Sequence, residues 1–336
     1  MTHDELIASF TGQIDQTLNR LIPAGTSCAL LDFPNHSNIG DSALWLGERA
    51  YLRRINARLV HTSDRLSLID SRLVESLGKD GLILLHGGGN LGDLWLTHQR
   101  LRERVIVAFP HHRIIQLPQT IHFREKSNLA QARRIFNAHP DLTLLVRDKR
   151  SLEFARNEFR AASLLCPDMV FALGPLRRPR RPTKKLVWLA RRDIPPHPSE
   201  VMKLATDGVR IVDWVIEKSS NPRSISTARQ WFRSWSVRRL ASSRLTSRSL
   251  PHLFDLLAAR RLRTGCLLLS QGQVVVTNRL HGHLLCLLLR IPHVIVDNGY
   301  GKISAYYETW TKSAELARQA DSWTEAFALA RALADG

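Results

Sequence analysis

The sequence predicts an α/β protein with two doubly wound domains that face each other across a cleft. Its apolar runs are continuous rather than alternating, which is typical of strands buried on both faces of a sheet. Helix-like segments separate these runs, and that order favours parallel strands joined by crossover helices. A basic, proline-rich stretch at 176–185 interrupts the series and is interpreted as a linker. The 336 residues, 44% of them hydrophobic, suffice for two cores.

The first domain is expected to span residues 1–175 and to carry four strand–helix units. Its third strand should end near Pro118, because proline cannot donate a hydrogen bond within a sheet. The expected strands are Cys28–Phe33, Gly81–Leu85, Arg113–Gln116 and Leu142–Val146, and the expected helices are Ser42–Ile55, Leu91–Arg104, Ser127–His139 and Lys149–Phe159. Right-handed crossovers place the carboxyl ends of such strands at one edge of the sheet.

The second domain, residues 186–336, repeats this alternation. The Ala-rich run Ser313–Leu333 predicts a C-terminal helix, which could pack back on the first domain. The segment Ser219–Ser249 is rich in Arg and Ser and is interpreted as a basic helix or a poorly ordered excursion. The expected strands are Leu186–Ala190, Val209–Trp214, Cys266–Ser270, Val274–Thr277 and Pro292–Asp297, with a helix at Leu284–Leu289.

The charge balance calls for an anionic partner. Lys and Arg total 48 against 30 Asp and Glu, a net charge of +18, and most of this excess lies between residues 175 and 265. Nucleic acid, anionic lipid or a phosphorylated substrate would suit such a chain. A non-catalytic nucleic-acid binder is an alternative, but no helix-turn-helix, zinc-finger or RNA-binding signature supports it, so we expect no nucleic-acid partner.

Cysteine and hydropathy patterns indicate a cytoplasmic protein. None of the four cysteines forms a CxxC pair, so we expect reduced, buried thiols and no structural zinc site. The N-terminal segment lacks the features of a signal peptide. The longest apolar stretch, Leu284–Val296, is too short to span a membrane and is interrupted by Arg290. Peripheral contact with the inner face of the plasma membrane stays open as an alternative.

Two polar segments follow strands of the first domain. Asn38 and Asp41 lie at a strand-to-helix turn, where they either cap the helix or face a ligand. Gly87, Gly88 and Gly89, with Asn90, either form a tight loop or let the backbone approach a ligand closely. A dinucleotide site is disfavoured because no acidic residue ends the next strand, and a lipase site because no G-x-S-x-G elbow exists.

Three further segments offer cations and an imidazole. Arg147 ends a strand and could bind a carboxylate or phosphate, or else form a local salt bridge. Arg279 and His281 lie at a loop–helix junction, where a helix N-terminus favours anions and His281 could exchange a proton. Lys302 follows the last expected strand, and its ammonium group could either bind a phosphate or be solvated. His281 and His283 lack further ligands for a metal, so no metal site is expected.

The order of these segments resembles the polysaccharide pyruvyl transferase family, particularly its bacterial exopolysaccharide members. The resemblance covers nearly the whole chain through HSNIGDSA, LLHGGGNLGDLW, IIQLPQTIHF, LLVRDKRSLEFA, LCPDMVFALG and VVTNRLHGHLLCLLLRIPHVIVDNGYGKISAYYETW. It implies a fold similar to the two facing Rossmann-like domains of glycosyltransferase-B-like enzymes. It also implies transfer of the enolpyruvyl carbons of phosphoenolpyruvate onto two sugar hydroxyls, which gives a pyruvate ketal and phosphate.

The resemblance also implies roles for individual residues. Arg279, Leu280 and His281 would bind phosphoenolpyruvate, with His281 as general acid. Arg147 and Lys302 would supply the other cations that its carboxylate and phosphate need. The acceptor side, in the first domain, would include Asn38, Gly87, Gly88, Gly89 and Asn90, with Asp41 as a candidate base. No metal or redox cofactor is implied.

The acceptor is expected to be an oligosaccharide, carried on a lipid diphosphate. Ser219–Ser249 has no motif of this family, and we interpret it either as a contact to anionic lipid or to that diphosphate, or as a solvated basic insertion. A sugar-nucleotide-dependent glycosyltransferase of the same architecture is the alternative enzyme. Such an enzyme would need a site for a nucleobase and a ribose, and the second domain of this chain offers no clear acidic residue to bind the ribose.

Overall fold

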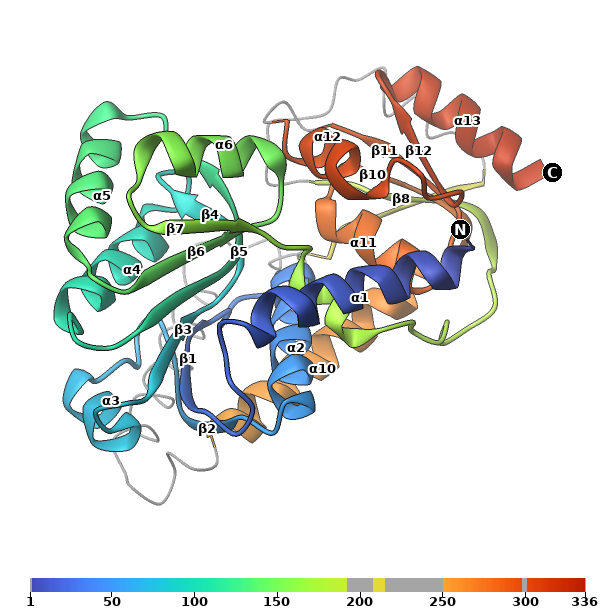
Figure 1. Cartoon of the computed structure of the whole chain (residues 1–336). Coiled ribbons are helices and arrows are strands. Elements are labelled where there is room, and N and C mark those ends of the chain that lie inside the picture. Colours follow the sequence, from blue (N-terminus) through green and yellow to red (C-terminus); the bar gives the residue numbers. More distant parts are fainter. Residues whose placement is uncertain (1, 192–207, 215–249, 298–300, 336) are drawn as a thin grey trace, which may run out of the picture.

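The protein is a mixed α/β molecule with two parallel β-sheets (Figure 1). A computed structural model describes residues 2–191, 208–214, 250–297 and 301–335. Every strand pairing in both sheets is parallel, as the continuous apolar runs predicted. The basic segment Ser219–Ser249 lies outside the described residues, as does part of the loop before Lys302.

The first sheet has the strand order β2-β1-β3-β5-β6-β7, with β4 paired to β5. Its strands are β1 (Ser27–Phe33), β2 (Arg58–Asp64), β3 (Leu82–Leu85), β4 (Gly88–Gly92), β5 (Ile114–His122), β6 (Leu142–Val146) and β7 (Ala162–Leu165). The helices that follow them are α2 (Ile39–Arg54), α3 (Asp70–Leu77), α4 (Leu96–Ala108), α5 (Lys126–Ala138), α6 (Lys149–Glu158) and the short η1 (Met169–Leu173). The direction of the chain across the sheet reverses at β1 and β3, which is where open α/β sheets bind ligands.

The second sheet has the order β12-β11-β10-β8-β9, and its direction reverses between β8 and β10. Its strands are β8 (Lys184–Leu189), β9 (Val209–Val212), β10 (Gly272–Thr277), β11 (His293–Val296) and β12 (Ala317–Ala320). Its helical elements are α10 (Leu250–Leu269), α11 (Leu280–Leu288), α12 (Lys302–Tyr306), η2 (Tyr307–Thr311) and α13 (Trp323–Asp335).

The strands are buried on both faces. In β1, Leu30 belongs to one hydrophobic core, while its neighbours Ala29 and Leu31 belong to another. Successive side chains of a strand point to opposite faces, so each face must be covered by helices. One of these cores continues into the second sheet, where it includes Val187 and Val275.

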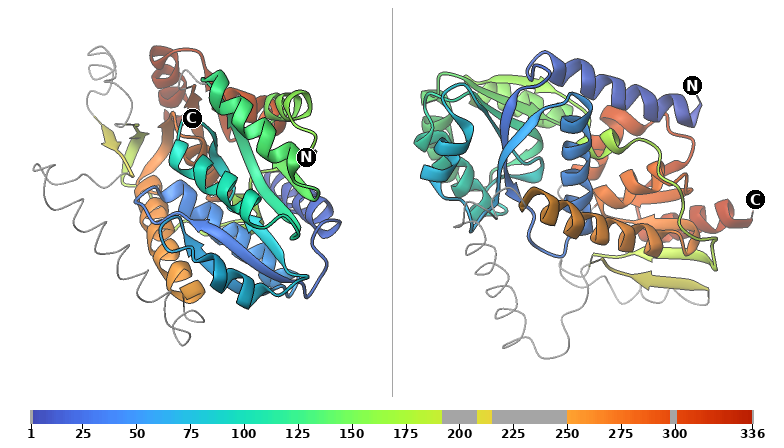
Figure 2. Two further views of the ribbon diagram at one scale, coloured as in Figure 1. Left: turned by 90° about the vertical axis from the view of Figure 1, so that its left-hand side faces the viewer. Right: turned by 90° about the horizontal axis from the view of Figure 1, so that it is seen from below.

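Helices α2 and α10 join the parts of the chain that carry the two sheets. They lie side by side in both views (Figure 1, Figure 2). Phe33 stacks on Phe254, with ring centroids 3.9 Å apart. Trp45 donates to the buried carboxylate of Asp255, and Arg49 binds the same carboxylate through two nitrogens at 3.0 and 3.1 Å. This anchor fixes α10 against α2.

The terminal helices pack differently from the prediction. The segment 313–333 contains β12 as well as α13, and α13 covers β8, β10, β11 and β12 of the second sheet rather than returning to the first. Phe327 packs there against Trp188. The N-terminal helix α1 (His3–Asn19) makes the long-range contact instead, because His3 hydrogen-bonds the carbonyl of Leu287 at 2.9 Å.

The predicted strand Cys266–Ser270 is wrong, because these residues lie mostly in the last turns of α10. A short apolar run fits a buried helix end as well as a strand, and periodicity alone cannot separate the two. The neighbouring strand Val274–Thr277 is confirmed as part of β10.

The bounds of several strands and helices also differ from those expected from the sequence. Strand β5 continues through Pro118 to His122, because an irregularity in its pairing with β6 falls between Gln116 and Gln119 and accommodates the proline. Part of the glycine segment forms β4, so α4 begins at Leu96. Helix α11 begins at Leu280, and β8 begins at Lys184, inside the expected linker.

Among the described residues, no helix is both long and apolar enough to cross a membrane. Within those same ranges, no group of three or more His, Cys, Asp or Glu side chains is arranged to hold a metal ion.

Candidate functional site

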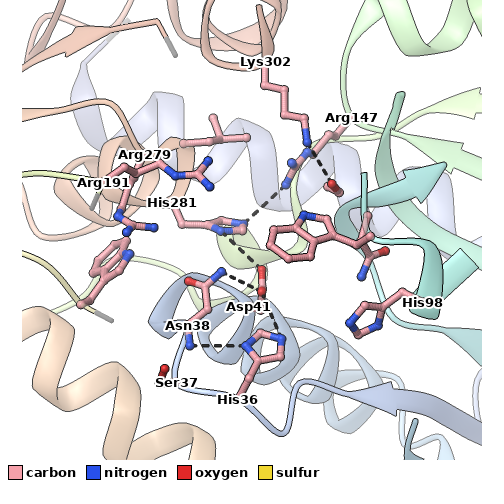
Figure 3. A pocket seen from close by; sticks show the side chains of 15 residues that line it. His36, Ser37, Asn38, Asp41, His98, Arg147, Arg191, Arg279, His281 and Lys302 are labelled. Atoms are coloured by element: carbon pink, nitrogen blue, oxygen red, sulfur yellow. Dashed lines mark hydrogen bonds and ion pairs between the residues drawn. The ribbon is translucent and has the colours of Figure 1, made fainter. Parts of the chain in front are cut away.

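A pocket of about 430 Å³ lies where the carboxyl ends of strands from both sheets meet. Segments that follow β1 and β3 line the pocket from the first sheet, and segments that follow β8 and β10 line it from the second. The strand order of each sheet reverses between these two strands, which is where such sheets bind ligands. Its lining residues are His36, Ser37, Asn38, Asp41, Gly89, Asn90, Trp95, His98, Arg147, Arg191, Trp214, Arg279, Leu280, His281 and Lys302. Figure 3 shows their side chains.

His281 lies at the centre of this pocket, in the first turn of α11 (Figure 3). Its Nε2 is 3.5 Å from Oδ2 of Asp168, and its Nδ1 is 3.9 Å from Oδ1 of Asp41. Gly40, in the first turn of α2, leaves room for the ring, since a Cβ there would overlap the imidazole. With 11% of its side chain exposed, His281 can reach a bound molecule while both ring nitrogens face carboxylates.

Asp168 and Arg147 form a buried ion pair beneath His281. Nη1 of Arg147 is 2.6 Å from Oδ2 of Asp168 and 3.5 Å from Nε2 of His281, and its Nε donates to Thr120. Burial alone would raise the pKa of Asp168, but His281 and Arg147 hold it well below its usual range. Asp148, the sequence neighbour of Arg147, instead caps α6 through Ser151. The local salt bridge between Arg147 and Asp148 is therefore not formed.

Asp41 is the second carboxylate beside His281. Asn38 caps α2 by accepting from the backbone of Gly40, and its Nδ2 donates to Asp41 at 2.8 Å. Nε2 of His36 lies 3.5 Å from the same carboxylate. Burial works against the charge of Asp41, but the imidazoles of His36 and His281 lower its pKa, so this carboxylate is ionised at neutral pH. Asn38 thus serves as a cap and also orients Asp41.

The cationic residues enter mainly from the second sheet. Arg279, the N-cap residue of α11, is held by Asp213 at 2.6 Å and by the carbonyl of Ala190. Arg191 follows β8 and lines the same side of the pocket. Lys302, at the start of α12, donates to the carbonyl of Gly89 at 2.9 Å. Burial, with the nearby charges of Arg147 and Arg191, lowers the pKa of Lys302 to about 8.

The glycine segment, residues 87–89, leaves room for the cationic side chains. A Cβ on Gly89 would lie 2.9 Å from Nη2 of Arg147 and 3.4 Å from Nζ of Lys302, so glycine is needed for their approach. Below it, the buried carboxylate of Glu48 accepts from the backbone of Gly87 and from the ring of His86, each at 2.8 Å. Gly87 and Gly88 support the segment and do not line the pocket, whereas Gly89 does.

The structure brings most of the sequence-predicted site residues together. The ones that line the pocket are Asn38, Asp41, Gly89, Asn90, Arg147, Arg279, Leu280, His281 and Lys302. Sequence reasoning missed further residues of the pocket or beneath it, namely His36, Trp95, His98, Asp168, Arg191 and Trp214. A signal existed for Arg191, which follows the apolar run of β8, and for Asp168, which is an acid within the otherwise apolar run Cys166–Leu173.

Comparisons of sequence and fold find known relatives of this chain. A family model described as polysaccharide pyruvyl transferase matches residues 38–300. Pyruvyl transferase 1 of Schizosaccharomyces pombe is 32% identical over 299 residues, which cover 86% of this chain and 70% of that protein. Putative pyruvyl transferase EpsO of Bacillus subtilis is 27% identical over 302 residues, 89% of each chain. The crystal structure of an uncharacterized protein from Klebsiella pneumoniae shares the fold, with a TM-score of 0.57, 15% identity, and coverage of 96% of this chain and 100% of that one.

Proposed function

This chain belongs to the polysaccharide pyruvyl transferase family, and from that premise we propose that it transfers pyruvate from phosphoenolpyruvate onto two hydroxyls of one sugar residue. The product would be a pyruvate ketal, and inorganic phosphate would be released. One observation carries the proposal: four cationic side chains converge with His281 in a single pocket.

The four cations suit a small, highly charged donor. Asp168 and Asp213 pair with Arg147 and Arg279, which orients two guanidinium groups toward the pocket. Such planar groups bind carboxylates and phosphates through two hydrogen bonds. The lowered pKa of Lys302 reflects burial first and then a surplus of nearby positive charge. An anion with several charges would relieve that repulsion and would be bound for the same reason.

The reaction needs one proton donor and one proton acceptor. Protonation of the methylene carbon by His281 would leave an oxocarbenium-like centre, which a sugar hydroxyl attacks. The bond between this carbon and the bridging oxygen of the phosphate group then breaks, phosphate leaves toward the cations, and the second hydroxyl closes the ring. The two hydroxyls lose two protons: one restores His281, and the other leaves with phosphate. Asp41, 3.9 Å from Nδ1 of His281, would guide the first of these protons back to the ring.

We further infer the roles of the two parts of the chain. Residues 1–175 would form the acceptor side and residues 186–336 the donor side, facing each other as in two-domain glycosyltransferases, with Arg147 as the contribution of the first part to the donor. The acceptor would be an exopolysaccharide repeat unit on a lipid diphosphate. Support comes from the positive charge between residues 175 and 265 and from α10, on which Leu256, Arg260 and Arg263 are exposed.

Ligand-induced stabilisation tests the donor. The melting temperature of the full chain should rise with phosphoenolpyruvate and stay unchanged with uridine diphosphate sugars, because a ligand that binds the folded state stabilises it. Stabilisation by the nucleotide sugars alone would favour a glycosyltransferase instead. Flotation with vesicles that contain or lack anionic lipid tests the membrane contact, and equal recovery in both would contradict it.

A further inference from the structure

We propose that the indole of Trp95 is the platform on which the acceptor sugar stacks, so that the pocket takes a neutral pyranose ring next to the anionic donor. This inference rests on the proposed function and adds to it the position and the chemical class of the acceptor subsite. Sugar rings carry a face of C–H groups that packs on an aromatic plane, and Trp combines a large apolar face with an N–H donor.

The exposure of Trp95 is the first observation. Trp95 is 54% exposed, whereas Trp45, Trp188 and Trp214 are fully buried. Within the described residues, the other large apolar side chains with comparable exposure are Val74, Leu96, Val107, Leu164 and Leu256, and none of these lines the pocket. An exposed apolar ring inside a polar pocket is a surface that a ligand can cover.

The backbone around Trp95 is held firmly, which is the second observation. Its carbonyl accepts from the amide of His98 at 2.9 Å at the start of α4. Two residues earlier, the carboxylate of Asp93 accepts from the amides of Arg124 and Glu125 at 2.7–2.9 Å. A ring presented from a fixed turn binds a ligand without a large ordering cost.

The distribution of charge in the pocket is the third observation. In Figure 3, Arg191 and Arg279 lie to the left of His281 and Lys302 and Arg147 lie above it to the right, while Asn38, Ser37 and His36 lie below it. Among the described lining residues, the segments 36–41 and 89–98 contribute no Lys or Arg. The imidazole, amide and hydroxyl groups of these segments can hydrogen-bond the hydroxyl groups of a neutral sugar.

His98, three residues after Trp95, lines the pocket as well. Asp32 binds Nδ1 of His98 at 2.7 Å and fixes the ring, whose centroid is 6.3 Å from that of His36. His36 in turn contacts Asp41, the carboxylate next to His281. Stacked on Trp95 in this pocket, a pyranose would direct two of its hydroxyls toward Asp41 and His281, where the ketal would form.

The test uses saturation-transfer NMR and calorimetry on the full chain, with methyl glucoside, methyl galactoside and methyl mannoside as probes. Trp95→Ala should lower the affinity for the best-binding of these probes about tenfold or more, as expected from the typical contribution of aromatic stacking to binding. Trp95→Phe should keep most of the affinity. Val107→Ala removes an exposed apolar side chain from the same helix outside the pocket and should change nothing.

Phosphoenolpyruvate binding, measured on the same samples, separates the two proposals. It should be unchanged in Trp95→Ala, and the melting temperatures of all three variants should match the parent. Equal pyranoside affinity in Trp95→Ala and parent, or no binding of any probe by the parent up to its solubility limit, would overturn the stacking role. Absence of phosphoenolpyruvate binding by the parent would instead contradict the proposed function.

Discussion

Nε2 of His281 and Oδ2 of Asp168 lie 3.5 Å apart, although the two residues are separated by 113 positions and follow strands of different sheets. The same carboxylate oxygen is 2.6 Å from Arg147. Asp168 thus holds a candidate proton donor and a candidate donor-binding cation in one geometry, from a fully buried position.

Asp168→Asn should abolish most of the activity. The amide keeps the shape of the side chain but removes the charge that orients His281 and Arg147, and misplaced acid catalysis typically costs about 10²–10⁴ in rate. Phosphate release from phosphoenolpyruvate would measure this loss. Loss of a partner from a buried ion pair also costs about 3–5 kcal/mol, so the melting temperature should fall. Asp335→Asn, which alters an exposed pair with Lys185, should leave both unchanged.

The affinity for phosphoenolpyruvate should fall as the pH rises above about 8. The pKa of Lys302 is lowered to about 8, so the side chain is charged at neutral pH and loses its charge above that value. An anion favours the charged form, hence binding should raise this pKa and take up a proton in the alkaline range. Calorimetry from pH 6.5 to about 9.5 should show up to about a tenfold loss per pH unit in that range.

Two substitutions at Lys302 check that assignment. Lys302→Arg keeps a charge that does not titrate in this range, so its pH profile should be flatter. Lys302→Met should bind weakly at every pH. A parent profile that is flat from pH 7 to about 9.5 would show that Lys302 does not contact the anion.

Gly40→Ala should reduce turnover without unfolding the protein. Ala is a better helix former than Gly by roughly 1 kcal/mol, but here its methyl group would displace the ring of His281. We expect a lower kcat and, because overpacking typically costs about 1–3 kcal/mol, a moderately lower melting temperature of a protein that still folds. Gly12→Ala is the matched control, because α1 leaves open space at that position. Equal kcat in the two variants would mean that the position of His281 does not limit the reaction.

Asp255→Asn should destabilise the protein by about 3–5 kcal/mol, because the guanidinium group of Arg49 would stay buried without its counter-charge. Denaturant unfolding measures this change. Glu308→Gln breaks an exposed pair with Lys312 and should leave the free energy of unfolding almost unchanged. A small effect at Asp255 would show that Trp45 and the stacked rings of Phe33 and Phe254 alone hold α10 on α2.

Local pattern was sufficient to predict much of the fold. The runs in β1, β3, β6, β8, β10 and β11 are apolar without alternation, and the sheets are parallel and covered on both faces. The run Cys266–Ser270 was ambiguous, because a buried helix end and a buried strand have the same composition. Strands β2 and β7 are partly exposed and carry polar residues, so they lack the continuous apolar signal.

The candidate site was partly predictable for a related reason. Arg147, Arg279 and His281 follow recognisable strands, and parallel topology brings such ends together. Asp168 follows the short strand β7 and meets His281 only through the tertiary fold. Trp95 could not be predicted as a pocket residue either, because nothing in the neighbouring sequence shows whether this Trp is exposed or buried.

The most direct test of the central claim follows the product and the released phosphate together. The full chain would be incubated in deuterated water with phosphoenolpyruvate and lipid-linked oligosaccharides extracted from its host, and the products would be analysed by NMR. The account predicts one phosphate released per pyruvate ketal, one solvent deuterium in each ketal methyl group, and neither product with a folded His281→Ala variant. Ketal formation by His281→Ala at the parent rate, or consumption of a nucleotide sugar without phosphoenolpyruvate, would contradict it.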